Sequence, residues 1–123
     1  GCEIAYELHL RGKHPTIVEM KNDLIAVKGV CLANSSYLRE YFALNKVPVY
    51  LKTALKSITD KGVKVSKDGK EFEIPADSVI MSVGYIPTPV AAEGKHVHVV
   101  GDSAKVGNLR TVIWGAWDVA MKL

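Results

Sequence analysis

Gly1-Cys2-Glu3-Ile4-Ala5 and Thr16-Ile17-Val18-Glu19 are the segments that decide how the first part of this chain folds. Apolar residues recur at helical spacing after Gly1, which predicts a helix over 1–11 that Gly12 ends. The second segment is short, β-branched and flanked by chain breakers, as a buried parallel strand is. A helix followed by such a strand predicts an α/β fold, with Glu19 at the carboxyl end of the strand.

A glycine at a helix start and an acidic residue about twenty positions later match the end of the fingerprint that binds dinucleotides. Gly1 would allow helix and strand to approach closely while helix N–H groups face a pyrophosphate. Glu19 would accept hydrogen bonds from the adenosine ribose. A plain terminal glycine and a solvated surface glutamate are the alternatives.

The first strand of that fingerprint and its two earlier glycines are not in this sequence. We therefore expect a piece of a larger protein, with an incomplete phosphate cradle. The absent strand is central in this fold, between the strand at Thr16 and one expected at 78–83. We hypothesise that a strand expected at 96–100 fills this slot, beside Ile17 and Val79.

Composition fits one globular core, because 48% of the 123 residues are hydrophobic. The apolar runs are too short to span a membrane and no signal pattern opens the chain, so we expect a cytoplasmic protein without a membrane partner. Lysines scattered along the chain give the net charge of +3, which argues against a nucleic-acid partner. Cys2, Cys31 and the four histidines lack ligand spacing, which predicts buried thiols and no metal site.

The remaining pattern predicts helices at 34–45, capped by Asn34 or Ser35, and at 109–121, with a strand at 47–52. Short alternating runs joined by glycine-containing turns predict a three-stranded antiparallel meander, at 55–59, 62–66 and 70–74. Buried strands are expected at 78–83 and 96–100.

These segments resemble the pyridine-nucleotide-dependent flavoprotein oxidoreductases, in which a nicotinamide-binding domain is inserted into an FAD-binding domain. The matching segments are Gly1 with Ala5 and Glu19, the run 76–87, and Val97-His98-Val99-Val100-Gly101-Asp102. The resemblance implies a Rossmann-like FAD/NAD(P)-binding fold with a three-stranded meander. It also implies an NAD(P)-binding domain over 1–87 and the C-terminal piece of an FAD-binding domain over 88–123.

The resemblance implies a cofactor role for each of several residues. Glu19 repels a 2′-phosphate and so favours NADH, although Lys21 and Lys28 keep NADPH as a minority alternative. Gly84 would let the backbone pass close to the nicotinamide. Asp102 would accept a hydrogen bond from a ribityl hydroxyl of FAD, with Gly101 permitting the close approach. Ordinary turn residues are the alternative for Gly84, Gly101 and Asp102.

Within this family the chain is similar to the 2-enoate reductase and 2,4-dienoyl-CoA reductase group, through segments 29–34 and 107–112. That likeness implies an NADH-dependent enzyme that reduces activated C=C bonds, with hydride passing from NADH to FAD in this half. A [4Fe–4S] cluster and FMN would belong to the absent N-terminal half. No residue here is assigned a catalytic role, and we expect the isolated chain to be inactive.

Two other interpretations stay open. One is an FAD/NAD(P)H oxidoreductase of the disulfide-reductase or ferredoxin-reductase kind. The other is a non-catalytic nucleotide-binding or interaction module.

Overall fold

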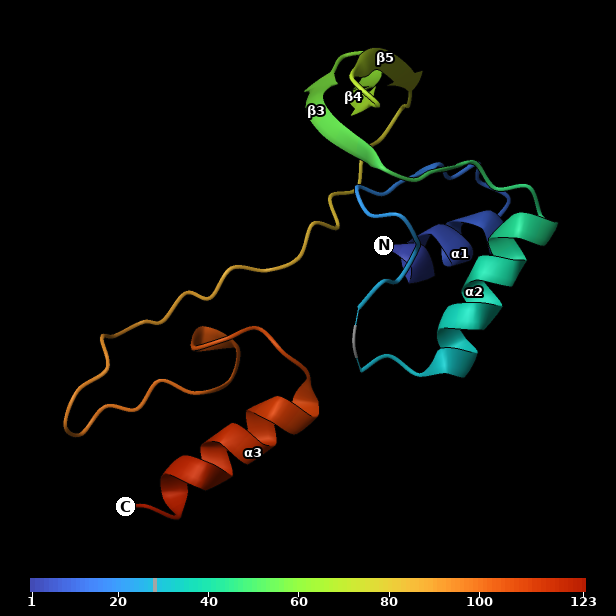
Figure 1. The fold of residues 1–123 in the computed structure, drawn as a ribbon. Helices are drawn as coiled ribbons and strands as arrows, with labels where there is room; N and C mark the ends of the chain where they lie inside the picture. The colour runs from blue at the N-terminus through green and yellow to red at the C-terminus, as the bar shows by residue number, and fades with distance from the viewer. Residues whose placement is uncertain (28) are drawn as a thin grey trace. The chain divides into compact units, whose positions relative to one another are not determined.

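The computed structural model describes residues 1–27 and 29–123, in two compact units, Gly1–Ser82 and Val83–Leu123 (Figure 1). The elements follow the order α1 (Cys2–Leu10), β1 (Ile17–Val18), α2 (Leu32–Leu44), β2 (Val49–Tyr50), β3 (Thr53–Thr59), β4 (Gly62–Lys67), β5 (Lys70–Pro75), the 3-10 turn η1 (Gly101–Ser103) and α3 (Leu109–Ala120). Within the described residues, no helix is long and apolar enough to cross a membrane.

In the first unit β1 and β2 form a parallel pair, in which Ile17 lies opposite Val49 and Val18 opposite Tyr50. Alternate side chains of a strand point to opposite faces. Ile17 and Val49 pack against the core formed with the helices, whereas Val18 and Tyr50 pack against the core of the meander. The pair therefore joins two hydrophobic cores, and the short strand predicted after Pro15 is confirmed over Ile17–Val18.

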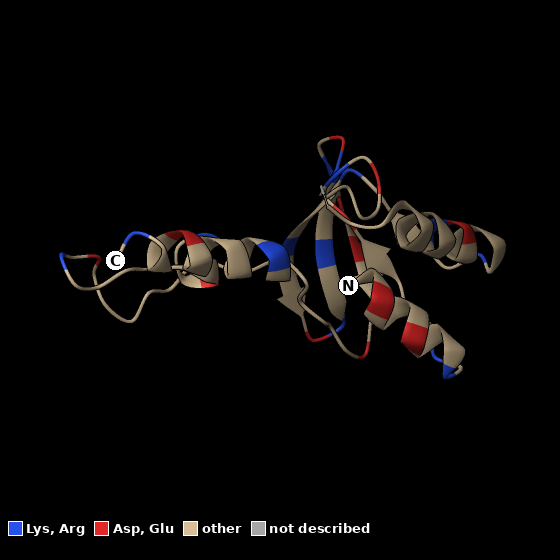
Figure 2. Cartoon of the chain, turned by 90° about the horizontal axis from the view of Figure 1, so that it is seen from below, with Lys and Arg blue, Asp and Glu red and all other residues tan. Residues whose placement is uncertain are grey.

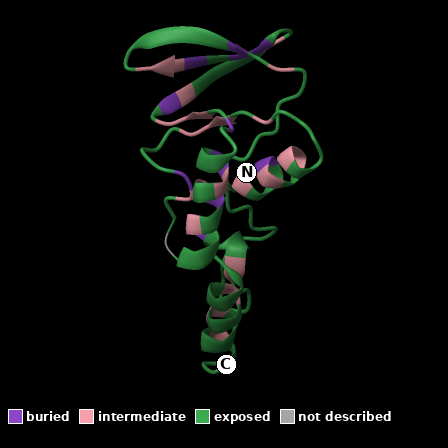
Figure 3. Cartoon of the chain, turned by 90° about the vertical axis from the view of Figure 1, so that its right-hand side faces the viewer, coloured by how far each residue is buried: buried purple, intermediate pink, exposed green. Residues whose placement is uncertain are grey.

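The helix core contains small and medium-sized side chains around one aromatic ring: Ala5, Leu24, Leu38, Phe42 and Val47. Beside it, the Tyr6 and Tyr41 rings meet edge to face with centroids 4.6 Å apart, and a 2.7 Å hydrogen bond joins His9 Nδ1 to the Tyr41 hydroxyl. These contacts hold α1 against α2. In Figure 3 the buried residues of this unit are seen on the helices, on a loop beside them and on the meander strands.

Helix α2 begins earlier than predicted. Its N-cap is Cys31, so Asn34 and Ser35 lie inside the helix and the predicted cap is wrong. Ser35 shares a face with Leu38 and Phe42 at spacings of three and seven residues, which turns it toward the core. The Ser35 hydroxyl is satisfied there by donating to the Leu32 carbonyl at 3.0 Å.

The antiparallel meander is confirmed in the order β3-β4-β5. Asp68 and Gly69 have φ angles of 50° and 77°, the conformation that the tight turn between β4 and β5 requires. Gly62, which begins β4, also needs to be glycine, because a Cβ there would collide with the Ile74 carbonyl oxygen. Local turn chemistry therefore sets the register of this sheet.

The buried strands predicted at 78–83 and 96–100 are wrong. Residues 78–83 form no strand and are exposed, and 96–100 contribute to only one isolated bridge, between Gly94 and Val97, in the described chain. Within the described residues Ile17 pairs with Val49 and Val97 with Gly94, so the strand pairing on which that hypothesis depends is not found. An apolar run becomes a strand only where a neighbour offers a ladder of hydrogen bonds, and β1 has β2 as its one partner among the described strands.

Replacing Phe42 by Ala should lower the free energy of unfolding of the first unit by about 3–5 kcal/mol, because it empties the centre of the helix core. Phe42 is 1% exposed, whereas Leu44 on the same helix is 82% exposed. Leu44→Ala, the matched control, should change this free energy by less than about 0.5 kcal/mol. Urea denaturation followed by circular dichroism measures both, and equal costs would contradict the assigned core.

Candidate functional site

Glu19 stands at the carboxyl end of β1, where the sequence predicts it. Its N–H donates to the Tyr50 carbonyl at 2.9 Å, and its carbonyl accepts from the Thr53 N–H at 3.0 Å. Glu19 as a residue is half-buried, and its carboxylate accepts an exposed hydrogen bond from the Lys21 N–H at 2.8 Å. The backbone at Glu19 is therefore fixed by the elements around it, and its side chain turns back over the following loop.

The first turn of α1 lies near this carboxylate. Burial raises the pKa of the Cys2 thiol above its ordinary value, and the negative charge of Glu19 raises it further. The guanidinium of Arg39 lowers the same pKa. Glu19 and Arg39 thus exert opposite electrostatic effects on Cys2 in the first turn of α1.

Gly1 is in close contact with a segment that the sequence did not connect to it. A Cβ on Gly1 would lie 3.1 Å from both Cβ and Oγ of Ser82, which is tighter than an ordinary contact. The absence of a side chain at Gly1 therefore lets the extended segment before Ser82 pass the start of α1. Ser82 is a neighbour of Gly1 that sequence reasoning missed.

The loop that follows Glu19 is held from α2. Arg39 donates from Nη2 to the Leu24 carbonyl at 2.6 Å and from Nε to the same oxygen at 3.1 Å. Its Nε also lies 3.1 Å from Asp23 Oδ1. Lys21 donates from Nζ to the Ala26 carbonyl at 3.2 Å. Lys28, the other lysine of the NADPH alternative, lies outside the described residues.

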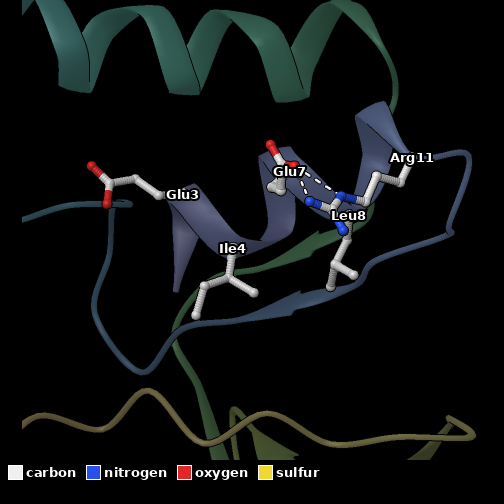
Figure 4. Close-up of a pocket in the computed structure, with 5 residues that line it drawn as sticks. All are labelled: Glu3, Ile4, Glu7, Leu8 and Arg11. Atoms are coloured by element: carbon white, nitrogen blue, oxygen red, sulfur yellow. Dashed lines mark hydrogen bonds and ion pairs between the residues drawn. The ribbon is translucent and has the colours of Figure 1, made fainter.

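Helix α1 also lines a shallow hollow of about 370 Å³ (Figure 4). Ile4 and Leu8 form its apolar part, and an ion pair of 2.7 Å between Glu7 Oε1 and Arg11 Nη2 lies along its rim. Both ionic side chains are mostly exposed, so this pair contributes little to stability. Figure 2 shows charged residues distributed through helices, strands and loops.

In the second unit Gly101 and Asp102 begin the turn η1. Gly101 has a φ of 61°, and a Cβ there would lie 3.3 Å from Val112 Cγ1 on α3, so a side chain is disfavoured by both backbone and space. The Asp102 side chain is exposed and accepts a hydrogen bond from the Gly107 N–H at 3.0 Å. This bond closes the loop that leads into α3.

Helix α3 starts with a reciprocal cap. The Asn108 side chain accepts from the Thr111 N–H at 3.1 Å, and the Thr111 hydroxyl accepts from the Asn108 N–H at 2.9 Å. The turn and the helix line an open, mostly apolar pocket of about 370 Å³, formed by Val99, Val100, Gly101, Ala104, Lys105, Val106, Thr111, Gly115 and Val119. The predicted pair Gly101-Asp102 is thus beside both an apolar pocket and a helix N-terminus.

Gly84 lies elsewhere. It belongs to the second unit, is exposed and has a φ of 91°, and in the described chain a Cβ on it would meet nothing within 4 Å. Its backbone conformation is that of a turn glycine.

The cysteines differ from the prediction of buried thiols. Cys2 is half-buried, whereas Cys31 is exposed because it precedes α2 as its N-cap. Both are free thiols. Among the described residues, no three His, Cys, Asp or Glu side chains gather as metal ligands.

Comparison with known proteins places these features in a family. Residues 1–117 match the pyridine nucleotide-disulphide oxidoreductase family. Cinnamate reductase of Clostridium sporogenes is 35% identical, over 100% of this chain and 19% of the relative. NADH oxidase of Thermoanaerobacter brockii is 28% identical, over 100% of this chain and 20% of the relative. A solved 2-naphthoyl-CoA reductase complex has a TM-score of 0.75 at 24% identity, over 99% of this chain and 19% of that one.

The chain belongs to the pyridine nucleotide-disulphide oxidoreductase family, a family of oxidoreductases that bind FAD and a pyridine nucleotide. Within it the chain is similar to the enoate-reductase and CoA-reductase type of flavoprotein, so the resemblance inferred from the sequence is confirmed. The Rossmann-like α/β fold with a three-stranded antiparallel sheet is confirmed as well. The chain spans about a fifth of the length of the relatives that it matches.

Maleimide should modify Cys31 faster than Cys2 at neutral pH, because Cys31 is exposed while burial raises the pKa of Cys2 and lowers its thiolate fraction. The rates of the single-cysteine variants Cys2→Ser and Cys31→Ser measure this. Because the pKa of Cys2 is raised, the rate of its reaction with maleimide should keep increasing at pH values above the ordinary thiol pKa. Equal rates in the folded chain would contradict the assigned environments, and denaturant should remove the difference.

Proposed function

We propose that this chain is the nucleotide-binding part of a larger NADH-dependent flavoprotein that reduces activated C=C bonds, in 2-enoates or dienoyl-CoA esters. In this part hydride passes from NADH to FAD. The observation that carries the proposal is the carboxylate of Glu19, which lies at the end of β1 and raises the pKa of Cys2 in the first turn of α1. The family indicates FAD and a pyridine nucleotide as cofactors, and the position of Glu19 supports NADH rather than NADPH.

Glu19 favours NADH for an electrostatic reason. A carboxylate can accept hydrogen bonds from both ribose hydroxyls, whereas a 2′-phosphate in the same place would put two anions in contact. The Lys21 N–H donates a hydrogen bond to Glu19 Oε1 and so orients the carboxylate. Gly1 contributes the close passage at the start of α1, where helix N–H groups can face a phosphate.

The second unit offers the elements of a flavin site. Asp102 is the acceptor for a ribityl hydroxyl, with Gly101 providing the backbone approach. The capped N-terminus of α3 presents N–H groups and a positive dipole end, which stabilise negative charge on a reduced ring. Bound FAD supplies the redox chemistry, and these residues hold and orient it. We assign Gly84 to the nicotinamide side.

The remainder of the parent enzyme is the partner that this chain requires. Helix α3 exposes large apolar side chains, each 57–81% accessible: Leu109, Ile113, Trp114, Trp117 and Met121. Such a group of exposed apolar side chains marks an interaction surface. We assign 1–87 to the NAD(P)-binding domain and 88–123 to the FAD-binding domain, with FMN and a [4Fe–4S] cluster in the parent's other half.

The substrate class follows from the relatives. The cinnamate reductase match covers the whole of this chain, which supports an enoate as the final acceptor. The chain by itself is expected not to reduce an enoate, because we assign none of its described residues as acid, base or nucleophile for that step. Its two free thiols support a reducing compartment, the cytoplasm.

Replacing Glu19 by Gln should weaken NADH binding about tenfold or more, because a hydrogen bond to a charged group is worth about 1.5–3 kcal/mol. NADPH binding should weaken less or improve, since the repulsion is removed. Glu71→Gln, at an exposed position on β5, is the matched control and should bind as wild type does. Calorimetric titration of each nucleotide into the chain measures this, and a wild-type chain that prefers NADPH would overturn the assignment.

Replacing Asp102 by Ala should weaken FAD binding about tenfold, by removing the charged acceptor. Asp102→Asn keeps an oxygen for the Gly107 N–H, so it separates closure of the loop from charge. The FAD affinity of Asp102→Asn should fall between the affinities of Asp102→Ala and wild type. Quenching of flavin fluorescence gives the affinities, with Asp118→Asn on exposed α3 as the control. FAD affinities unchanged in both Asp102 variants would contradict this role.

A further inference from the structure

We propose that Arg39 is a positioning residue that sets the preference for NADH, by clamping the loop 20–27 so that Glu19 is held in place. The inference rests on the proposed function of Glu19 and extends it to a residue on another element. Arg39 comes from the middle of α2 and reaches the loop through hydrogen bonds to the Leu24 carbonyl and to the Asp23 carboxylate.

The loop that Arg39 holds begins at the functional carboxylate. The Lys21 N–H donates to Glu19 Oε1 at 2.8 Å, so the loop backbone itself orients the side chain. The Lys21 carbonyl accepts from the Lys52 N–H at 2.8 Å, which fixes the near end of the loop against the turn before β3. At its far end, Lys21 Nζ donates to the Ala26 carbonyl at 3.2 Å. Displacement of the loop would therefore move the donor that holds Glu19.

The loop also contains strained backbone beside the clamp. Ile25 has a φ of 53°, which is unfavourable for a β-branched residue and persists only where surrounding contacts impose it. The residue before it, Leu24, is 5% exposed in the helix core, and its carbonyl is the oxygen that Arg39 binds twice. Burial of the side chain and the guanidinium fork on the carbonyl together hold the strained conformation.

The position of Arg39 suits this role. Its side chain is 30% exposed, so most of it is packed against the loop and α2. A guanidinium can donate to a carbonyl and a carboxylate at once in fixed directions, and a lysine ammonium cannot reproduce this fork. Loss of Arg39 would release the loop and with it the Lys21 ammonium, a group able to donate hydrogen bonds to the 2′-phosphate of NADPH.

The test compares NADH and NADPH dissociation constants of the wild-type chain with those of Arg39→Met and Arg39→Lys. Arg39→Met should reduce the preference for NADH by about tenfold, the effect of one charged hydrogen bond. Arg39→Lys should show the same reduced preference for NADH as Arg39→Met. Arg11→Met is the matched control, because Arg11 is the other arginine in an ion pair and lies on the exposed side of α1. Its preference should equal that of wild type.

A second readout needs no nucleotide. Hydrogen exchange at amides 20–27 should become faster in Arg39→Met, while exchange in the meander stays unchanged. Lys21→Met added to Arg39→Met should remove any gain in NADPH binding. Should Arg39→Met fail to fold, Asp23→Ala removes one partner of the clamp at a half-exposed side chain and should give a smaller shift in the same direction.

The outcomes separate the two proposals. A wild-type chain that binds neither nucleotide shows that the proposed function is wrong, and the role of Arg39 falls with it. A wild-type chain that prefers NADH, with the same preference in Arg39→Met, overturns the role of Arg39 alone. A wild-type preference for NADH in Arg39→Lys would also overturn the role of Arg39, because a positive charge without the paired guanidinium hydrogen bonds would then be enough.

Discussion

The parallel pairing of β1 with β2 is the constraint on which the first unit depends. Only two residue pairs form it, yet Ile17 and Val49 face the helix core while Val18 and Tyr50 face the meander core. The same pairing fixes Glu19, because its N–H bonds to Tyr50 at the end of the ladder. One short ladder thus connects the packing of both cores to the position of the candidate nucleotide carboxylate.

Elements set by local chemistry could be predicted from the sequence, and those set by distant partners could not. The meander follows from its turns, since Asp68-Gly69 can adopt the positive φ angles that a tight turn needs. The segment 78–83 is as apolar as a buried strand, but its fate depends on whether another strand lies beside it. Serine is a residue type that often caps helices, but the spacing of Ser35 from Leu38 and Phe42 places it on the core face of α2 instead.

The candidate site divides in the same way. The place of Glu19 follows from a helix-to-strand spacing that is visible in the sequence. Arg39 and Ser82 could not be predicted, because their partners are a backbone carbonyl and a glycine far away in the chain. Gly101 and Asp102 lie where a strand was expected to end, although a 3-10 turn takes its place. Only the part of the site that depends on local spacing, such as the position of Glu19, could be predicted from one sequence.

The tight turn at Asp68-Gly69 has a consequence for the order of folding. The contacts within β3, β4 and β5 join residues close in the sequence, so the loop-closure entropy of this sheet is small and it can form early. The β1–β2 ladder joins residues much farther apart and gains few hydrogen bonds for that closure. A meander already formed would offer the apolar face of Val63, Val65 and Ile74 as a template on which Val18 and Tyr50 meet.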